Sequence, residues 1–224
     1  MLTTGGAMIK AVVFDLDGTL VDSAPDIQTS VNKMLAEEGK TQLDLPTVVS
    51  FVGNGLPKLV ERVMHVRDIP GTEFERLSAR LLAIYGASSS EGTSVFEGVV
   101  DVLGKLRTRG FDLGVCTNKP EQPARRVLKA KGLIDHFSTI VGGDSLSVRK
   151  PDPLPLQTVM ADLAPNEVLY VGDSEIDAET ATNAGVKFAL FTEGYRKSPV
   201  TQIEHDVRFS SWEDFLSLAE LCDT

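Results

Sequence analysis

Short apolar, β-branched runs alternate along the chain with longer segments whose apolar residues recur at helical spacing. The first run, Ile9 to Phe14, is apolar apart from Lys10 and is followed by the turn-forming pair Asp17-Gly18. Further strands are predicted at residues 112–116, 139–141, 168–171, 186–190 and 207–209, and helices at 98–109, 120–131, 153–162, 175–184 and 211–222. Such alternation predicts an α/β fold, a doubly wound parallel sheet with helices on both faces.

The interval from Asp22 to about Gly92 breaks this alternation. It contains three or four helical patterns and no convincing strand, which predicts a helical insertion. Small and turn-forming residues at 21–25 and 86–92 predict the hinges through which the chain enters and leaves it. The expected organisation is a Rossmann-like core, residues 1–21 and 93–224, with an inserted α-helical domain, residues 22–92.

The composition narrows the classes of partner. The 224 residues include 32 acidic and 22 basic side chains, a formal charge of -10, so attraction to nucleic acid or to a membrane surface is not expected. The only cysteines, Cys116 and Cys222, suggest neither a disulfide framework nor a CxxC metal site. No N-terminal apolar run is long enough for a signal peptide. We expect a cytoplasmic protein, monomeric or homodimeric.

The ends of the predicted strands carry an unusually polar set of residues. In an open parallel sheet, ligands bind outside the carboxyl ends of the strands, so these side chains are expected to converge. The set comprises Asp15, Asp17, Gly18 and Thr19, then Thr117, Asn118 and Lys119, then Asp144 and Lys150, and finally Asp173, Ser174 and Asp177. Folding alone is a poor explanation for so many polar residues at one edge.

Four aspartates in this set indicate a metal site. Asp15 and Asp17 alternate with Leu16, so both carboxylates point the same way in an extended chain. Asp173 and Asp177 lie four apart at a predicted helix start and project from one face. Like charges about 4 Å apart repel by roughly 4 kcal/mol at an effective dielectric near 20. One lysine cannot balance that repulsion, whereas a divalent cation can, and an all-oxygen ligand set suits Mg²⁺.

The other polar residues suit a phosphate group. Lys150 can hold the charge that spreads over phosphate oxygens during transfer, and Gly18 lets the backbone approach a ligand closely. Thr117 and Asn118, just before Pro120, can offer a hydroxyl and a backbone N–H. Taken separately, helix capping explains Thr117 and Asn118 equally well, and a solvated loop explains Lys150 better. Their joint order is what favours a functional site.

Four motifs in that order carry a family resemblance. They are DLDGTL at 15–20, CTNK at 116–119, RKPDP at 149–153 and GDSEID at 172–177. Together they resemble the haloacid dehalogenase superfamily over the whole predicted core. The helical insertion directly after the first motif is similar to the α-helical cap domain of that superfamily, which closes over the active site.

The resemblance implies a role for each motif residue. Asp15 is implied as the nucleophile and Asp17 as the general acid and base. Thr117 and Lys150 are implied as phosphate ligands. The implied Mg²⁺ ligands are Asp15, the backbone carbonyl of Asp17, and Asp173, with Asp177 as an outer acidic partner.

Asp17 favours one reaction class within this superfamily. A dehalogenase expels halide and needs no acid to protonate a leaving oxygen, whereas cleavage of a phosphate ester does. The expected cycle is attack on phosphorus by Asp15, protonation of the leaving alkoxide by Asp17, and hydrolysis of the aspartyl phosphate by water that Asp17 deprotonates. The sequence thus predicts a Mg²⁺-dependent phosphoric monoester hydrolase acting on a small phosphorylated metabolite.

A glycine-rich turn in the insertion bears on the substrate. Gly53-Asn54-Gly55 is most simply a turn between helices, but it can also enter the site, which makes Asn54 a candidate substrate contact. The stretch FVGNG at 51–55, with FDLDGTLVDSAPDI at 14–27, is similar to phosphoglycolate phosphatases and implies 2-phosphoglycolate as substrate. Lys58 and Arg62 share a helical face and could meet a substrate carboxylate, but a solvated face explains them better. Residues 195–197 could border the site, but a plain surface loop is favoured.

Two other functions remain open at this point. A phosphosugar mutase of the same superfamily returns the phosphate to a sugar instead of to water, and sequence separates the two poorly. A phosphoacceptor signalling module also carries an aspartate at a strand end. Paired acids on the first strand and a large helical insertion favour a closing active site over that module.

Overall fold

A six-stranded parallel sheet forms the centre of the computed structural model, which describes residues 9–87, 90–164 and 167–221. The strand order is β5-β4-β1-β6-β7-β8. The strands are β1 (Ala11–Phe14), β4 (Asp112–Cys116), β5 (Thr139–Val141), β6 (Val168–Gly172), β7 (Lys187–Phe191) and β8 (Val207–Phe209). Each lies within two residues of its predicted bounds, so the predicted parallel sheet is confirmed.

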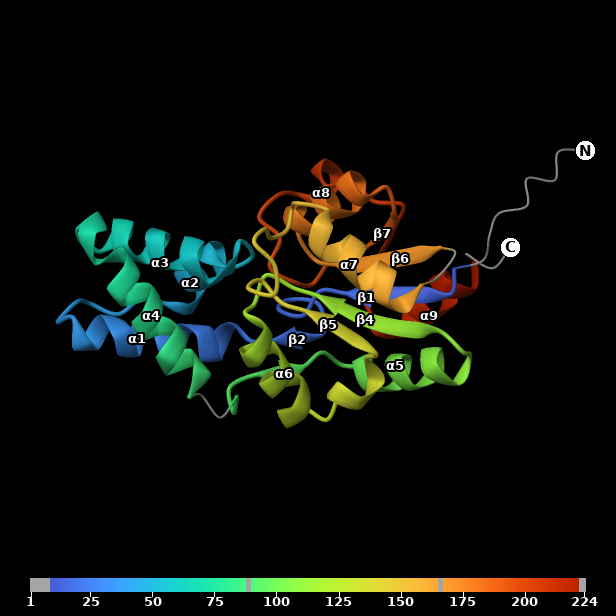
Figure 1. Cartoon of the computed structure of the whole chain (residues 1–224), viewed down its shortest axis with the longest axis horizontal. Coiled ribbons are helices and arrows are strands. Elements are labelled where there is room, and N and C mark those ends of the chain that lie inside the picture. The colour runs from blue at the N-terminus through green and yellow to red at the C-terminus, as the bar shows by residue number, and fades with distance from the viewer. Residues whose placement is uncertain (1–8, 88–89, 165–166, 222–224) are drawn as a thin grey trace, which may run out of the picture.

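Helices cover both faces of this sheet because successive strand residues point to opposite sides. Val12 and Phe14 of β1 pack with α5 (Val99–Thr108), α6 (Glu121–Ala130) and α9 (Trp212–Leu221). Ala11 and Val13 pack on the other side with α7 (Leu154–Leu163) and α8 (Glu175–Ala184). Figure 1 shows the two helical layers with the sheet between them. The fold is therefore doubly wound, as predicted.

The order of the strands determines where a ligand binds. The chain runs outward from β1 through β4 to β5, then returns to β6 on the other side of β1 and continues outward to β8. The direction of winding thus reverses between β1 and β6. A crevice outside the carboxyl ends of the strands is expected at such a reversal. The first and fourth motifs both lie there, because they directly follow β1 and β6.

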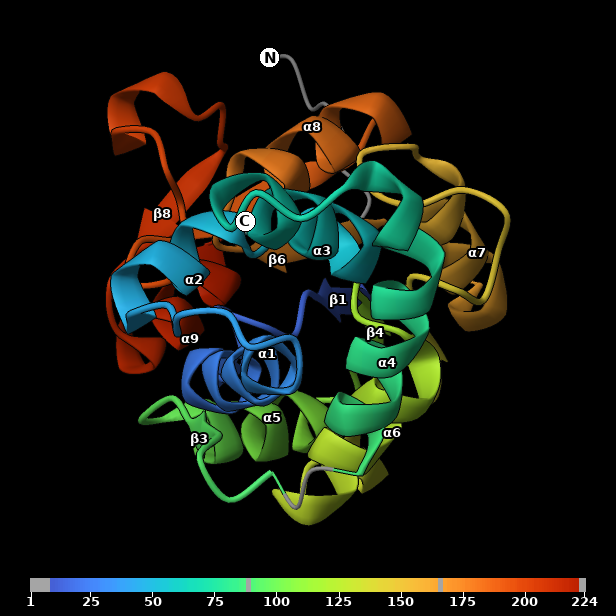
Figure 2. The same cartoon turned by 90° about the vertical axis from the view of Figure 1, so that its left-hand side faces the viewer.

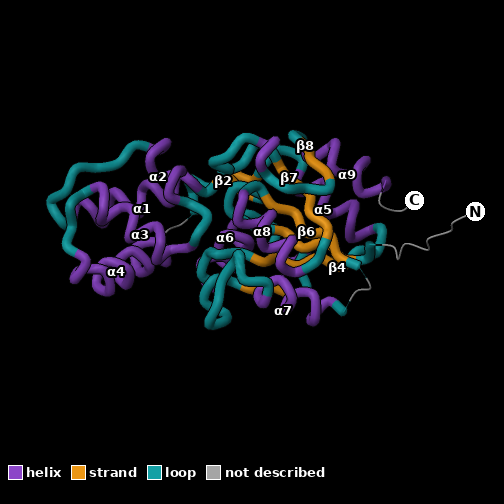
Figure 3. The backbone as a smooth tube through the Cα atoms, turned by 90° about the horizontal axis from the view of Figure 1, so that it is seen from above, coloured by secondary structure: helices purple, strands orange, loops and turns teal. Residues whose placement is uncertain are grey.

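The helical insertion has a hydrophobic core of its own. Its helices are α1 (Ala24–Glu37), α2 (Leu45–Phe51), α3 (Gly55–Val66) and α4 (Phe74–Gly86). Apolar residues from all four pack together, among them Met34, Val48, Val60 and Leu81. Figures 2 and 3 show these helices gathered at one end of the molecule, beside the carboxyl ends of the central strands.

A two-stranded ribbon at the junction was not predicted. β2 (Val21–Asp22) pairs antiparallel with β3 (Ser94–Val95), at the entry to and exit from the insertion. Strands of two residues carry too little alternation to be found in a sequence. The entry hinge is accordingly shorter than predicted, since α1 already begins at Ala24.

Some sequence predictions fall outside the described residues. These are residues 88–89 of the return hinge and Cys222, at which the last predicted helix ends. Across the described segments, every helix is too short or too polar to cross a lipid bilayer.

Candidate active site

The acidic residues of the first and fourth motifs meet at the carboxyl edge of the sheet. Asp15, Asp173 and Asp177 each place one carboxylate oxygen within 4.8 Å of the others. The Thr19 hydroxyl donates to Asp173 Oδ1 at 2.8 Å. Gly18 makes this approach feasible, because a Cβ at that position would lie 2.5 Å from Asp173 Oδ2. Sequence analysis predicts that Gly18 lets the backbone approach a ligand closely. In the structure, the group next to Gly18 is the Asp173 carboxylate.

Lys150 lies within this acidic cluster. Its side chain is 2% exposed, with Nζ 2.9 Å from Asp15 Oδ1 and 2.6 Å from Asp177 Oδ1. Nζ also donates to the Tyr170 hydroxyl at 2.8 Å. The solvated-loop interpretation of Lys150 is therefore wrong. Because the lysine follows no strand directly, only folding of the loop after β5 could bring it inward.

The charges in the cluster are not balanced by this single lysine. Burial raises the pKa of Asp15 to about 6, against the opposing charge of Lys150. Burial, reinforced by the charges of Asp177 and Asp15, raises the pKa of Asp173 well above its ordinary value. The buried Asp15 Oδ1 is ion-paired with Lys150 at 2.9 Å and has no hydrogen-bond partner among the other described atoms. Three converging carboxylates with a single lysine beside them fit a hard divalent cation such as Mg²⁺.

Asp177 differs from the other two acids because each of its oxygens already accepts at least two hydrogen bonds. Oδ1 accepts from Lys150 at 2.6 Å and from the Tyr170 hydroxyl at 2.9 Å. Oδ2 accepts from the Ser174 hydroxyl at 2.6 Å and from the backbone N–H groups of Ser174 and Asp173. Burial opposes ionisation of Asp177, but Lys150 and these donors outweigh it and lower its pKa. Asp177 therefore orients Lys150 and the Asp173 loop.

Asp17 faces away from this cluster and toward a second lysine. Its Oδ1 accepts from Lys119 Nζ at 2.7 Å and from the Ser23 hydroxyl at 2.5 Å. Lys119 also donates to the hydroxyl of Tyr85, which comes from α4 of the insertion. Lys119 is in the strand-end set, but the sequence assigned it no role because its partners lie far away along the chain.

The second motif holds neighbouring loops through Asn118 and lines the cavity with Thr117. The Asn118 amide donates to the carbonyls of Gly53 and Lys150, both at 3.0 Å, and accepts from the Lys150 N–H at 3.1 Å. This side chain thus holds the Lys150 loop and contacts the turn of the insertion. Thr117, 3% exposed, lines the cavity in front of Asp15, and a phosphate contact by either residue stays a prediction.

Arg62 of α3 holds the glycine-rich turn of the insertion in place. Arg62 donates to the Asn54 side chain and to the Phe51 carbonyl, each at 2.8 Å. Arg62 is therefore not a solvated residue, whereas Lys58 is exposed and pairs with Glu61. Asn54 is not among the residues that line the cavity, so its predicted substrate contact has no support in this arrangement.

Tyr195 is the functional residue that the sequence missed most clearly. It was expected in a plain surface loop, but its backbone N–H donates to Asp173 Oδ2 at 2.6 Å. Its hydroxyl accepts from the N–H groups of Ser23 and Ala24, at 2.8 and 3.0 Å, and donates to Asp22. Tyr195 thus links the acidic cluster to the start of α1. Asp144, another strand-end residue, instead accepts from the Glu121 N–H at the start of α6.

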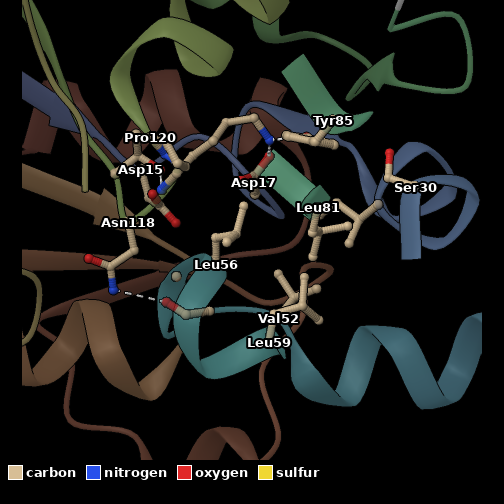
Figure 4. Close-up of a pocket in the computed structure, with 15 residues that line it drawn as sticks. Asp15, Asp17, Ser30, Val52, Leu56, Leu59, Leu81, Tyr85, Asn118 and Pro120 are labelled. Atoms are coloured by element: carbon tan, nitrogen blue, oxygen red, sulfur yellow. Dashed lines mark hydrogen bonds and ion pairs between the residues drawn. The ribbon is translucent and has the colours of Figure 1, made fainter. Parts of the chain in front are cut away.

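A cavity lies between the core and the insertion. Its polar floor comes from the first and second motifs, and its other walls come from α1, α3, α4 and the turn before α3 (Figure 4). Leu56, Leu59 and Leu81 make those walls largely apolar. A ligand bound here contacts the aspartates on one side and the insertion on the other.

Gly194→Ala is expected to destabilise the protein by about 1–3 kcal/mol, because the new methyl overpacks the Asp173 loop. A Cβ at Gly194 would lie 2.3 Å from both the Asp173 Cβ and the Gly18 carbonyl oxygen. Gly104→Ala in α5 is the matched control, since no atom lies within 4 Å of its Cβ position. That control should gain up to about 1 kcal/mol from helix propensity. Urea unfolding of both variants measures the difference, and equal stabilities would contradict this packing.

Comparison with known proteins agrees with the site. The family model for haloacid dehalogenase-like hydrolases matches residues 12–191. A phosphoglycolate phosphatase of Cereibacter sphaeroides is 48% identical over 212 residues, which cover 94% of this chain and 97% of that protein. One from Rhodospirillum rubrum is 42% identical over 221 residues, covering 95% and 90%.

A solved structure extends the agreement to three dimensions. The crystal structure of a predicted phosphoglycolate phosphatase from Haemophilus somnus 129PT superimposes with a TM-score of 0.89 at 30% identity, covering 96% of this chain and 99% of that one. The family match spans all four motifs, so the resemblance found in the sequence is confirmed. The chain therefore belongs to the haloacid dehalogenase-like hydrolases.

Proposed function

We propose that this phosphoric monoester hydrolase acts on 2-phosphoglycolate, with Mg²⁺ bound at the acidic cluster. The observation that carries the proposal is the convergence of Asp15, Asp173 and Lys150, with Asp15 also lining the cavity. The names of the full-length relatives support the choice of substrate. A cytoplasmic location, expected from the sequence, belongs to the same proposal.

The reaction begins at Asp15. Its carboxylate attacks phosphorus, and the bond from phosphorus to the leaving oxygen breaks as the aspartyl phosphate forms. Asp17 protonates the leaving oxygen to give glycolate and then removes a proton from the water that hydrolyses the aspartyl phosphate. The engagement of Asp17 with Lys119 and Ser23 supports this assignment, because it holds the carboxylate apart from the metal cluster.

The charges of the phosphoryl group are met by Lys150 and Thr117. Asp15, Asp173 and the backbone carbonyl of Asp17 are the proposed Mg²⁺ ligands, and Asp177 lies outside that set because protein donors already fill both of its oxygens. When bound, the metal neutralises charge on the phosphoryl oxygens and on the attacking carboxylate.

Residues 22–92 form the proposed cap domain, which encloses the substrate against the core. The separate hydrophobic core of α1 to α4 supports this division, and two contacts hold the insertion against the core. Asn118 donates to the Gly53 carbonyl, and Lys197 donates to the Val52 carbonyl, both at 3.0 Å. Exclusion of bulk water by such closure strengthens electrostatic interactions and protects the aspartyl phosphate.

A panel of small phosphate monoesters, assayed for phosphate release with and without Mg²⁺, tests the proposal. We expect kcat/KM for 2-phosphoglycolate to exceed that for phosphate monoesters with an uncharged leaving group by roughly tenfold or more. Removal of divalent cations with a chelator should abolish turnover, and added Mg²⁺ should restore it. Isomerised sugar phosphate without phosphate release would instead indicate a mutase. A single phosphorylation without turnover would indicate a phosphoacceptor module.

A further inference from the structure

The mostly apolar walls of the cavity offer few partners for the carboxylate of an acidic leaving group. Glycolate carries a carboxylate, which needs a cation or several donors when it is removed from water. The walls from α1, α3 and α4 are built mainly from leucine, isoleucine and tyrosine. Among the described residues that line the cavity, Lys119 is the only cation.

The other described cations nearby do not line the cavity, and each has a partner elsewhere. Lys150 pairs with Asp15 and Asp177 on the phosphoryl side. Arg62 is bound to the turn of the insertion, and Lys197 donates to the Val52 carbonyl. Lys58 lies on the surface with its side chain 52% exposed.

Lys119 is held by Asp17 and Tyr85 where the leaving group of the proposed reaction is expected. Its side chain is 2% exposed, and Nζ lies 2.7 Å from Asp17 Oδ1 and 4.5 Å from the centre of the Tyr85 ring. The Tyr85 hydroxyl is a second donor beside it. Because Asp17 protonates the leaving oxygen, that oxygen lies within hydrogen-bond reach of Asp17. In 2-phosphoglycolate one methylene joins this oxygen to the carboxylate, which therefore lies close to Lys119.

We propose that Lys119 and the Tyr85 hydroxyl bind the carboxylate of the leaving group and so select phosphate esters that carry an acid next to the ester carbon. The inference rests on the proposed function and names the residues that determine its specificity. Tyr85 belongs to the insertion, whereas Lys119 belongs to the core. The substrate carboxylate thus contacts both the insertion and the core. A phosphate ester with an uncharged leaving group cannot make these contacts.

A comparison of two substrates in Lys119→Met separates this role from an effect on Asp17. The substrates are 2-phosphoglycolate and ethyl phosphate, in which a methyl group replaces the carboxylate. Damage to Asp17 lowers kcat/KM for both by the same factor, because both need their leaving oxygen protonated. We expect an additional loss of about 10- to 100-fold for 2-phosphoglycolate alone, the size of a lost charged hydrogen bond. Lys119→Arg should retain part of the preference.

Tyr85→Phe provides a second readout that keeps the aromatic ring under Nζ. It should reduce the ratio of kcat/KM for 2-phosphoglycolate to that for ethyl phosphate by about 2- to 10-fold, less than Lys119→Met does. Lys58→Met is the matched control, since it removes one exposed lysine that lies outside the cavity. Its two kcat/KM values should equal those of the wild type. Thermal unfolding shows whether each variant is folded.

Failure of the inference and failure of the proposed function give different results. If the wild type prefers 2-phosphoglycolate and Lys119→Met lowers kcat/KM for both substrates by the same factor, the proposed carboxylate site is wrong while the proposed function stands. If the wild type shows no preference for the carboxylate, both are wrong. If Lys119→Met does not fold, an unchanged preference in both Lys119→Arg and Tyr85→Phe overturns the inference.

Discussion

Asp15→Asn is expected to lower kcat for phosphate release by roughly 10⁴-fold or more, the loss typical for removal of a catalytic nucleophile. The amide has nearly the shape of the carboxylate but cannot attack phosphorus. It also withdraws one of the three charges that converge at the acidic cluster. Measurement of phosphate release from 2-phosphoglycolate at saturating Mg²⁺ checks this result.

The same variant should keep its fold. In the absence of metal, Asp15 is a buried acid crowded by Asp177 and Asp17, and its raised pKa reflects that burial. The substitution weakens the contact with Lys150, but it also removes the larger cost of burying the charge, so Tm without Mg²⁺ should not fall. Asp112→Asn is the matched control, because Asp112 is exposed at the opposite end of β4. Near-normal turnover in Asp15→Asn would mean that water or another residue attacks phosphorus.

Much of the fold could be predicted because its signals are local. The apolar run that becomes β1 is buried on both sides, and such strands are read directly as continuous hydrophobic segments. Parallel topology then places the residues after β1, β4 and β6 at one edge. This rule alone predicts that Asp15, Thr117 and Asp173 lie together.

The roles of individual polar residues could not be predicted in the same way. Lys150 and Arg62 resemble solvated residues in the sequence, and their burial depends on partners elsewhere in the chain. Tyr195 reaches Asp173 and Asp22 at once, across 22 and 173 positions of sequence. No periodicity records contacts over such separations, so the link between the acidic cluster and α1 emerged only from the folded chain.

The contact of Lys119 with Tyr85 has the same origin. The sequence predicts the loop after β4 that contains Lys119 and the helical character of the insertion that contains Tyr85, without bounds for α4. Their meeting depends on how the insertion is placed over the core, which local pattern does not determine. The proposed specificity contacts thus lie between the insertion and the core, while the residues proposed for phosphoryl transfer lie in the core motifs.

Asp17→Asn is expected to separate the two halves of the reaction. With 2-phosphoglycolate, kcat should fall by about 10²- to 10⁴-fold, because glycolate alkoxide is a poor leaving group without a proton. With 4-nitrophenyl phosphate, the leaving group departs without an acid, so Asp15 can still be phosphorylated. Hydrolysis of the aspartyl phosphate remains slow because no base activates the water. The variant should therefore release one equivalent of nitrophenol per enzyme in a burst and then nearly stop.

Stopped-flow absorbance measures the burst, and intact-protein mass spectrometry detects the phosphate bound to the enzyme. The variant keeps the Asp15, Asp173 and Lys150 geometry, since Asp17 contacts Lys119 and Ser23 instead. Asp15→Asn under the same conditions should show neither burst nor adduct. A steady state without a burst in Asp17→Asn would mean that Asp17 acts before phosphorus is attacked. Rapid turnover of both substrates would remove Asp17 from the chemistry altogether, and with it the reason to place the leaving group beside Lys119.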